Sequence, residues 1–393
     1  MSKDIWILSA TRTAIGSFGG ALKEVPPTQL GATVLREAVK RSGVDPAAFD
    51  HVVFGNVIPT EPRDAYLSRV ASMDGGLSKD VPAFNVNRLC GSGLQAIVSA
   101  AQAIALGDAD FAVGGGAESM SRGPYMVPAA RWGARMGDIA MVDYMTAILH
   151  DPFGNFHMGI TAENVAAEHG ITRAMQDELA LESQRRAIAA IDAGRFKDQI
   201  VPVEIASRKG TVVFDTDEHP RRDASLQALS AMRTVFKKDG TVTAGNASGI
   251  NDGAAALVLA SAGRARTLGL KPMARLVAYA HAGVDPALMG IGPVPATQRV
   301  LEKAGLKVSD LDVIESNEAF AAQACAVSRA LDFDPAKVNV NGSGISLGHP
   351  VGATGAIIAT KALYELQRVQ GRYALVTMCI GGGQGIAAIF ERA

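Results

Sequence analysis

The 393-residue chain carries 38 basic and 39 acidic residues, a net charge of −1 at pH 7. This balance excludes a strongly basic face and argues against nucleic acid as a partner, although Arg221 and Arg222 leave a local basic pair for an anionic ligand. Hydrophobic residues form 48% of the chain, more than one core usually absorbs, so two or three domains are predicted. Few aromatic residues (5%) and 42 glycines favour a close-packed α/β protein with tight turns.

The three cysteines, Cys90, Cys325 and Cys379, show no paired spacing. Such an odd and sparse count argues against a disulfide framework and for a reducing compartment. Because neither a Cys-x-x-Cys pair nor clustered histidines accompany them, no metal site is expected. We identify no signal-peptide pattern and no apolar run of about 18 residues, so we expect a cytoplasmic protein without membrane contact.

Along the chain, apolar strand-like runs alternate with helical patterns, which predicts parallel sheets covered by helices. A helix-like segment ends at Gly43, and a short polar link to Asp50 leads into a strand-like run. The same order recurs much later, from Gly305 through Asp312 to another strand-like run, with identical spacing from glycine to aspartate. A repeat of this length predicts two similar α/β halves, fused and facing each other.

An irregular stretch rich in Met, Gly, Pro and charged residues separates the two repeats. The predicted units are a first half, a loop insertion and a second half, at residues 1–118 (completed by about 247–270), 119–246 and 271–393. A loop region of this length inside a compact protein is usually functional, although a linker decorated with a helix is the alternative.

Two parts of this insertion carry specific expectations. One helix is predicted between an N-cap at Thr172 and a stop at Gly194. Four apolar residues fall near one face of this helix: Met175, Leu179, Ile188 and Ile191. The segment 124–138, which holds Tyr125 and Trp132, is expected to form an exposed arm for subunit contact. A loop that covers a channel is the alternative for this segment.

Cys90 is the first candidate for chemistry. It follows a short strand-like run, precedes a helix-like run and is close to two glycines, which let the backbone turn sharply and a substrate approach. A cysteine at a helix start feels a partial positive charge, which lowers its pKa and raises its thiolate fraction. The alternative is a small buried hydrophobic residue, the commonest fate of a free cysteine. Position alone leaves both interpretations open.

Two further candidates lie at glycine-rich loops in the second half. Cys379 ends an apolar strand-like run before the glycines at 381–383, at the kind of edge where ligands of open α/β sheets gather. His349 lies among five glycines within residues 341–355, where a neutral imidazole can accept a thiol proton or donate to an oxyanion. A plain tight turn and a histidine that caps a turn are the respective alternatives.

Two more residues of the second half have simpler interpretations. Asn317 ends the repeated strand and could hold a water or a carbonyl, although a cap for the following helix explains it equally well. Cys325 lies inside that helix among alanines and is assigned to core packing.

Seven ordered motifs resemble those of the thiolases, and the resemblance covers essentially the whole chain. They are Arg-Thr-Ala-Ile-Gly at 12–16, Asn-Arg-Leu-Cys-Gly-Ser-Gly at 87–93, Gly-Gly-Gly-Ala-Glu-Ser-Met at 114–120, Ala-Gly-Asn-Ala-Ser at 244–248, Asn-Glu-Ala-Phe at 317–320, Gly-His-Pro at 348–350 and Cys-Ile-Gly-Gly-Gly at 379–383. Within the family the chain looks most like the bacterial β-ketothiolases that supply polyhydroxyalkanoate synthesis, including the broad-specificity type. The resemblance implies the thiolase fold, in which two similar α/β halves with mixed five-stranded sheets and helices are fused and carry a loop insertion domain.

The resemblance also implies a role for each candidate. Cys90 would be the acylated nucleophile, His349 would take its proton, and Cys379 would be the second acid and base. His349 and a water held by Asn317 would form one oxyanion hole, and the backbone N–H groups of Cys90 and Gly381 the other. The residues that match the coenzyme A channel and the acyl pocket are His157, Met158, Arg221, Ser248, Ala319, Phe320 and Met289.

The implied activity is a reversible Claisen condensation of acetyl-CoA with acetyl-CoA or a short acyl-CoA such as propionyl-CoA, with ping-pong kinetics through acyl-Cys90. The alternative within the family is a degradative 3-ketoacyl-CoA thiolase of fatty-acid β-oxidation. Acetyl-CoA, acyl-CoA and CoA would be the partners, without a metal or redox cofactor, and the expected assembly is a homotetramer, a dimer of dimers.

Three rival classes fit the residues less well. A carrier-protein-dependent condensing enzyme would lack a catalytic second cysteine such as Cys379. A non-catalytic acyl-CoA-binding protein is expected to lack at least one of Cys90, His349 and Cys379. An NAD-linked dehydrogenase needs a Gly-x-Gly-x-x-Gly fingerprint that we do not find.

Overall fold

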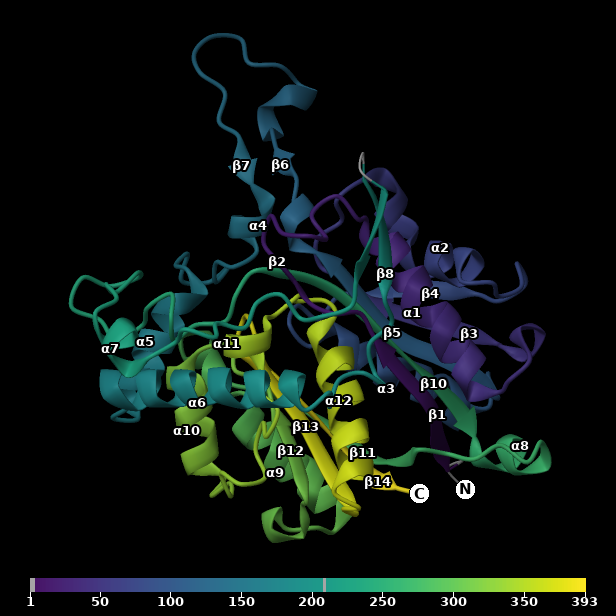
Figure 1. The fold of residues 1–393 in the computed structure, drawn as a ribbon. Helices are drawn as coiled ribbons and strands as arrows, with labels where there is room; N and C mark the ends of the chain where they lie inside the picture. Colours follow the sequence, from purple (N-terminus) through teal and green to yellow (C-terminus); the bar gives the residue numbers. More distant parts are fainter. Residues whose placement is uncertain (1–3, 208–209) are drawn as a thin grey trace.

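A mixed β-sheet flanked by helices forms the body of the molecule in the computed structural model, which describes residues 4–207 and 210–393 (Figure 1). The strands run in the order β12-β13-β14-β11-β1-β10-β5-β3-β4, and β2 pairs with β10 outside this path. Their bounds are β1 (Ile5–Arg12), β2 (Gly16–Ser17), β3 (His51–Gly55), β4 (Ala83–Val86), β5 (Phe111–Ser119), β10 (Asn251–Ser261), β11 (Ala274–Gly283), β12 (Val313–Ser316), β13 (Tyr373–Ile380) and β14 (Gln384–Arg392).

The sheet consists of two parts that meet at β1 and β11. These two strands pair antiparallel, with Trp6 opposite Arg275 and Ile7 opposite Ala274. In the first part, the parallel strands β3, β4 and β5 are followed by β10, which lies between β5 and β1 and is antiparallel to both. In the second part, β12 is parallel to β13, and β14 is antiparallel to β13 and β11. The α/β fold class predicted from the sequence is confirmed.

The internal repeat has a shared structural basis in the two parts. One carboxylate oxygen of Asp50 accepts hydrogen bonds from the backbone N–H groups of residues 110 and 111, at 2.7 and 3.0 Å. One carboxylate oxygen of Asp312 accepts from residues 372 and 373 in the same way, at 2.6 and 3.1 Å. Each aspartate therefore ties the start of one strand to the start of its parallel neighbour. Gly43 and Gly305, seven residues earlier in each copy, both cap a helix with φ near +70° (70° and 65°).

The second part departs from the predicted five-stranded sheet in one detail. The position beside β12 that corresponds to β4 is occupied by an isolated parallel bridge between Ile314 and Val338. Asn339, directly after the bridge, has φ +47°, and a left-handed residue cannot continue an extended strand. The second part thus has four strands and a single bridge, and it is continuous with the first part through β11.

The helices form layers around the sheet. Their bounds are α1 (Pro27–Ser42), α2 (Leu67–Asp74), α3 (Ser92–Leu106), α8 (Ala262–Thr267), α9 (Pro293–Ala304), α10 (Ala321–Ala330), α11 (Gly344–Leu347) and α12 (Thr354–Arg368), and the 3₁₀ turns span Pro46–Ala48, Pro62–Tyr66, Met120–Arg122, Pro128–Arg131, Pro286–Ile291 and Val308–Asp310. Helices α3 and α12 pack against each other and contact strands of both parts, so they form a middle layer. Helix α1 packs on β1, β5 and β10, and α9 packs on β11 and β14.

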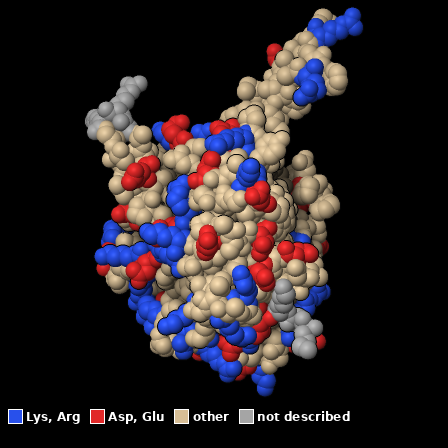
Figure 2. All heavy atoms as spheres, turned by 90° about the vertical axis from the view of Figure 1, so that its right-hand side faces the viewer, with Lys and Arg blue, Asp and Glu red and all other residues tan. Residues whose placement is uncertain are grey.

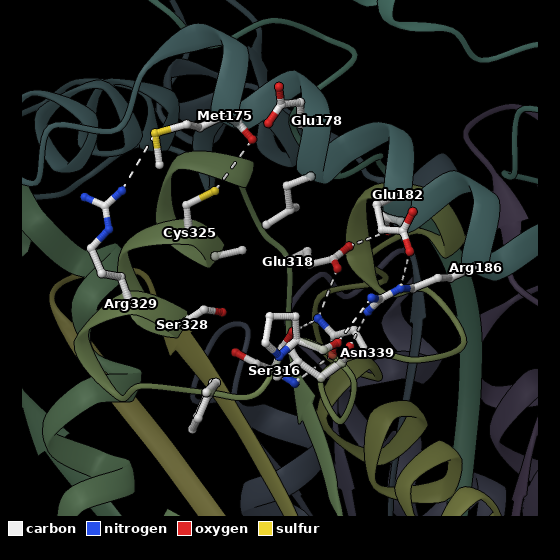
Figure 3. Close-up of a pocket in the computed structure, with 16 residues that line it drawn as sticks. Met175, Glu178, Glu182, Arg186, Ser316, Glu318, Cys325, Ser328, Arg329 and Asn339 are labelled. Carbon is white, nitrogen blue, oxygen red and sulfur yellow. Dashed lines mark hydrogen bonds and ion pairs between the residues drawn. The ribbon is translucent and has the colours of Figure 1, made fainter.

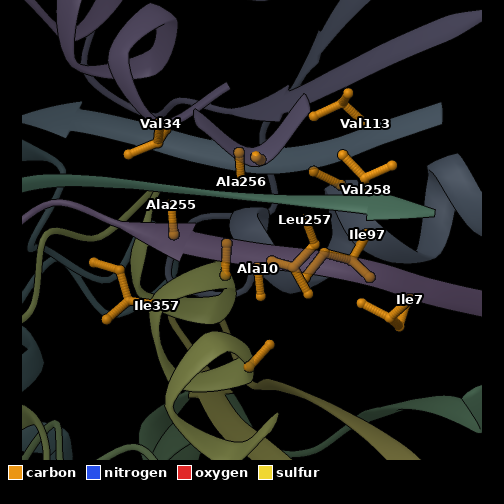
Figure 4. Close-up of a cluster of buried hydrophobic side chains, with 14 of the residues drawn as sticks. Ile7, Ala10, Val34, Ile97, Val113, Ala255, Ala256, Leu257, Val258 and Ile357 are labelled. Atoms are coloured by element: carbon orange, nitrogen blue, oxygen red, sulfur yellow. The ribbon is translucent and has the colours of Figure 1, made fainter. Parts of the chain in front are cut away.

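The middle layer explains the most apolar segment of the chain. The expectation that no apolar run of about 18 residues occurs needs correction, because residues Leu89–Leu106, which include α3, have a mean hydropathy of 1.5 and pass as a membrane span by length and composition alone. In the structure α3 is covered by β3, β5 and α12, which is the environment of a core helix. Figure 4 shows Ile97 of α3 beside Leu257 of β10 in this core, to which Ile357 of α12 also belongs. Burial of such side chains contributes about 25 cal/mol per Å² of apolar surface.

The insertion between β5 and β10 wraps around this body. Its elements are β6 (Tyr125–Met126), β7 (Val142–Asp143), α4 (Tyr144–Ala147), α5 (Met158–Glu168), α6 (Arg173–Asp192), β8 (Val203–Ser207), β9 (Gly210–Phe214) and α7 (Leu226–Ser230). The predicted arm is exposed: β6 and β7 pair at the base of a hairpin that projects away from the body (Figures 1 and 2). At its tip Trp132 and Met136 are 89% and 92% exposed. On the face in Figure 2, basic and acidic side chains are interspersed.

The predicted helix of the insertion is α6, and its N-cap is confirmed because the Thr172 hydroxyl accepts a hydrogen bond from the backbone N–H of Met175. The expected apolar face was wrong in part, since its four residues are only half-buried: Met175, Leu179, Ile188 and Ile191. Apart from Leu181, the buried side is made of small and polar residues: Gln176, Asp177, Ala180, Ser183, Gln184, Ala187 and Ala190. Helix α6 packs on α10 and α11, and small residues allow this close helix packing.

Candidate active site

Cys90 lies in a tight turn between β4 and α3. The Ser92 hydroxyl accepts from the backbone N–H of Arg88 at 2.9 Å and donates to the carbonyl of Leu89 at 2.6 Å. Leu89 has φ +46°, a strained conformation that places Cys90 directly before the first turn of α3. A Cβ atom on Gly91 would lie 2.6 Å from the terminal side-chain carbon of Ile380, so the turn packs tightly on the end of β13.

The thiol of Cys90 needs a base to ionise. Burial raises the pKa of Cys90, while hydrogen bonding from the backbone N–H of Gly381 and of Cys90 itself opposes this shift. The same two N–H groups therefore point at the position of the sulfur. The resting group is a thiol, and a nearby proton acceptor is required before it can attack a carbonyl.

His349 lies in the loop before α12, at the place that corresponds to Cys90 before α3. Its Nδ1 atom is 2.6 Å from the Thr354 hydroxyl, which donates its own proton to the carbonyl of Pro350 at 2.9 Å. The hydroxyl therefore accepts from Nδ1–H, and Nε2 is left as the basic nitrogen. Burial lowers the pKa of His349 to about 4, so the imidazole is neutral at pH 7. The backbone N–H of His349 donates to the side-chain oxygen of Asn251 at 2.9 Å, which anchors the loop on β10.

Cys379 is fully buried near the end of β13. Burial raises the pKa of its thiol, and a thiolate at the neighbouring Cys90 raises this pKa further, so ionisation of one sulfur disfavours ionisation of the other. Cys379 belongs to the buried cluster that also contains Met158, Met289 and Phe320, directly behind the wall of the cavity described below.

Asn317 follows β12 and is fully buried. Its backbone N–H donates to the carbonyl of Thr377 at 3.0 Å, but neither polar atom of its side chain has a hydrogen-bond partner among the described residues. Leaving a buried amide unpaired is costly, so this side chain is available to hold a water or a substrate oxygen. Asn317 itself does not line the cavity; its neighbours Ala319 and Phe320 do.

One cavity of about 480 Å³ collects most of the predicted site residues, and this size suits a small ligand. Those with predicted catalytic roles on its wall are Cys90, His349 and Gly381. All seven residues predicted to bind coenzyme A or the acyl group also line it: His157, Met158, Arg221, Ser248, Met289, Ala319 and Phe320. Residues from both halves and from the insertion therefore surround one space.

The insertion side of this cavity offers one aromatic surface and one cation. The ring of His157 stacks on Phe236 with centroids 4.5 Å apart, and burial lowers its pKa to about 4, so it is neutral. Arg221 forms no ion pair within the described part of the chain. The two arginines of the predicted basic pair do not act together on one ligand, because the guanidinium of Arg222 forms an ion pair with Asp192 at 2.6 Å.

Several lining and supporting residues were not predicted from the sequence. Phe236 and His219 line the cavity, and Thr354 and Asn251 hold the imidazole and its loop. None of them belongs to a motif with a chemical signature. Only Thr354 carried a local signal, because it lies at the start of the helical run that follows His349.

A second cavity, of about 440 Å³, lies between α6 and α10 (Figure 3). Cys325 borders it and is half-buried, which modifies its assignment to core packing. Burial raises the pKa of the Cys325 thiol to about 11, so it is protonated and unreactive at neutral pH. On the floor of this cavity, Glu318 accepts hydrogen bonds from Ser183 at 2.6 Å and Asn339 at 3.0 Å. This network supports the chain on one side of Asn317.

A cysteine and a histidine that precede two facing helices of a doubled α/β fold, and that line one cavity, define the class of thiol-dependent acyl-transferring enzymes. Sequence comparison agrees with this class. The family model for the thiolase N-terminal domain matches residues 5–263, and the model for the thiolase C-terminal domain matches residues 270–392. The chain belongs to the thiolase family of enzymes, which confirms the resemblance found in its motifs.

Individual relatives agree over the full length of the chain. Beta-ketothiolase BktB of Cupriavidus necator is 69% identical over 393 residues, which are 100% of each chain. The acetyl-CoA acetyltransferase of Escherichia coli is 52% identical over 395 residues, 99% of each chain. The crystal structure of the Bacillus anthracis acetyl-CoA acetyltransferase has a TM-score of 0.98 at 47% identity and covers 100% of this chain and 99% of its own. Human mitochondrial 3-ketoacyl-CoA thiolase in complex with CoA has a TM-score of 0.96 at 44% identity, with coverages of 100% and 98%.

Proposed function

We propose that this thiolase catalyses the reversible Claisen condensation of acetyl-CoA with acetyl-CoA or a short acyl-CoA, such as propionyl-CoA, through an acyl-Cys90 intermediate. The observation that carries the proposal is that Cys90, His349 and Gly381 line one cavity, while Cys379 is buried in the cluster of side chains behind its wall. The high identity to a β-ketothiolase favours this activity over a degradative 3-ketoacyl-CoA thiolase.

In the first half-reaction, Nε2 of His349 takes the thiol proton as the sulfur of Cys90 attacks the thioester carbonyl. The carbon–sulfur bond to coenzyme A breaks, and the proton passes from His349 to the departing CoA thiolate. One thioester replaces another, so the step is close to isoenergetic and reversible. The backbone N–H groups of Cys90 and Gly381 stabilise the oxyanion, and one such donor is commonly worth about 3 kcal/mol.

In the second half-reaction, the Cys379 thiol gives its proton to the neutral His349, and the thiolate that results removes an α-proton from acetyl-CoA. An acylated Cys90 cannot become a thiolate, so one of the two causes that raise the pKa of Cys379 is absent in the acyl-enzyme. The enolate carbon forms a bond to the acyl carbon, the bond to Cys90 breaks, and the released Cys90 thiolate takes up the proton held by His349, while Cys379 keeps the α-proton. His349 and a water on Asn317 stabilise the enolate oxygen.

Arg221 supplies a cation for a phosphate of coenzyme A, and His157, Met158, Ser248, Ala319 and Phe320 line the path of its pantetheine arm. Met289 borders the acyl end and limits chain length. The two thiols and one imidazole supply all the acid–base and nucleophilic chemistry of this cycle, so we propose that coenzyme A thioesters are substrates and that no resident cofactor takes part.

We further propose a cytoplasmic homotetramer, a dimer of dimers joined by the exposed arms, that supplies 3-oxoacyl-CoA to polyhydroxyalkanoate synthesis. The support for the arms is the large exposed apolar surface at their tips, since contiguous patches of this kind often mark protein contacts. The support for the pathway is the similarity to a β-ketothiolase.

Two variants test the mechanism. Cys379→Ala is expected to become acetylated by acetyl-CoA, seen as a mass increase of the intact protein, while condensation falls by about 10²–10⁴-fold. Cys90→Ala is expected to lose both activities. Undiminished condensation by either variant would exclude the assigned role. Thiolysis of acetoacetyl-CoA and 3-oxovaleryl-CoA by the unmodified enzyme then measures the chain-length range.

A further inference from the structure

Glu118 is a fully buried carboxylate at the end of β5 that the mechanism above does not use. Its two oxygens accept four hydrogen bonds, all from the chain. Three come from the first half: the backbone N–H groups of Val57 and Ile58, both at 3.0 Å, and the side-chain amide of Asn56 at 2.9 Å. The fourth comes from the backbone N–H of Gly352 at 2.8 Å, 234 residues away in the second half.

Gly352 lies three residues after His349, in the loop that presents the imidazole. Three glycines of the first half, from β3, α3 and β5, surround it: Gly55, Gly93 and Gly116. A Cβ atom on Gly55 or Gly116 would lie 2.6 or 2.3 Å from the carbonyl oxygen of Gly352. None of these residues has a positive φ, so glycine is required here because the backbones lie close together and not because of an unusual backbone conformation.

The contacts of Glu118 also reach the nucleophile. Cys90 packs against one apolar cluster that contains Val57, Ile58 and Val351. Val57 and Ile58 donate hydrogen bonds to Glu118, and Val351 directly precedes the donor Gly352. The His349 loop of the second half and the Cys90 turn of the first half are thus held together by one carboxylate and by close backbone contacts at three glycines.

We propose that Glu118 is a positioning residue that sets the distance between the His349 imidazole and the Cys90 thiol by clamping the loop at Gly352 onto the half that carries Cys90. This role rests on the proposed function, because it acts through the two groups that perform acylation. A displacement of a reacting group by about 1 Å can cost on the order of a hundredfold in rate.

The hydrogen bonds favour an ionised Glu118, since all four partners are donors and an added proton would displace one of them. Burial acts in the opposite direction and raises the pKa of Glu118 to about 8. Its charge in turn raises the pKa of Cys90. Glu118 therefore has two opposite effects: it positions the His349 base, and it makes the Cys90 thiol less acidic. The two effects can be measured separately.

The test compares Glu118→Gln, Glu118→Asp and Asp312→Asn in the full-length enzyme. Glu118→Gln must place an NH₂ group against at least one N–H donor, so the rate of Cys90 acetylation and kcat for thiolysis are expected to fall about tenfold to a hundredfold, with KM for CoA changed less than twofold. Glu118 is ionised above its pKa of about 8, in the range where Cys90 titrates, so the loss of its charge is expected to shift alkylation of Cys90 by iodoacetamide to lower pH. Because a general loosening of the fold would also lower the pKa of a buried thiol, a variant that keeps the charge is needed for comparison.

Glu118→Asp keeps the charge but shortens the reach to Gly352. It is expected to lose acetylation rate while its alkylation profile stays at the pH of the unmodified enzyme, and it takes over the test if Glu118→Gln does not fold. Asp312→Asn is the matched control, a carboxylate that binds two backbone N–H groups away from the cavity, and it is expected to lower the melting temperature without changing kcat. An unchanged kcat in both Glu118 variants, or an equal loss of kcat in Asp312→Asn, overturns the inference. Full activity of Cys90→Ala would instead overturn the proposed function.

Discussion

The Nδ1 atom of His349 lies 2.6 Å from the hydroxyl oxygen of Thr354, and both residues are buried. This contact selects the tautomer of the imidazole, because a hydroxyl that already donates to the Pro350 carbonyl can only accept from Nδ1–H. The nitrogen that remains unprotonated is the one available to the cavity.

Replacing Thr354 by Val keeps the shape of the side chain and removes the acceptor of Nδ1–H. We expect the rate of Cys90 acetylation to fall about tenfold to a hundredfold, because the wrong tautomer becomes populated and a buried N–H loses its partner. Stopped-flow or quenched-flow acetylation by acetyl-CoA measures this. Thr354→Ser restores the hydroxyl and should recover most of the rate; a valine variant as fast as the parent would contradict the assignment.

The pH dependence of acylation follows from the neutral state of His349. Burial lowers its pKa from 6.5 to about 4, so the base stays unprotonated as the pH falls from 7 to about 5. We expect kcat/KM for the acylation step to show no loss centred near pH 6.5 and a decline only toward pH 4. A midpoint near 6.5, with the enzyme still folded by circular dichroism, would show that the imidazole is not buried as described.

Arg221 and Arg222 provide a matched pair for coenzyme A binding. Arg221→Ala is expected to raise KM for CoA about tenfold with little change in kcat, because a hydrogen-bonded charge contact to a phosphate is lost. Arg222→Ala removes only a surface pair with Asp192 and should leave KM within twofold. The steady-state kinetics of thiolysis distinguish the two, and equal effects of both changes would argue against a specific contact by Arg221.

Arg12 links β1 to the insertion through a fully buried ion pair. Its guanidinium binds both oxygens of Asp217, at 2.7 and 2.9 Å, and lies 4.8 Å from the ring centroid of Phe196. Arg12→Met leaves the carboxylate buried without its partner, which we expect to cost about 3–5 kcal/mol of unfolding free energy. Urea denaturation measures this value. Adding Asp217→Asn should recover part of the loss, whereas additive losses would show that the two residues are not coupled.

The arm predicts a change of assembly without a change of chemistry. Trp132→Glu combined with Met136→Glu places charges on the apolar tip and is expected to convert tetramers into dimers, measured by light scattering. Activity should stay within about twofold, because the cavity contains no residue of the arm tip. Leu106→Glu, at an apolar side chain 80% exposed on the body, is the control that should leave the mass unchanged.

The sequence predicted features whose signal is local. The glycine-to-aspartate repeat was visible because each copy caps its own helix and binds the start of the next strand, at Asp50 and Asp312. The motifs around Cys90 and His349 were visible because a reactive residue among glycines stands out in a short window. The family and the α/β fold follow from these local patterns, and both are confirmed.

Features that depend on distant partners were not predictable in this way. Glu118 belongs to the family motif at residues 114–120, but the motif does not indicate its partner Gly352, which is 234 residues away. The apolar pattern did not identify the inward face of α6, because this face includes polar residues whose partners are distant. Gln176, for example, is fully buried and donates to the hydroxyl of Thr241 at 2.9 Å. The fifth strand expected beside β12 is reduced to a single bridge because Asn339 has a left-handed backbone conformation. No pattern in the neighbouring sequence indicates this conformation.

The position of β10 has a consequence for biosynthesis. This strand follows the insertion, yet it lies between β1 and β5, and its last residue is Ser261. A nascent chain on the ribosome can therefore form the separate helices early, but β1 has no neighbour to pair with in its half until residue 261 has emerged. Strand β1 and the edge of β5 that β10 covers therefore stay unpaired while more than a hundred residues of insertion are translated, and unpaired strand edges of this kind favour aggregation.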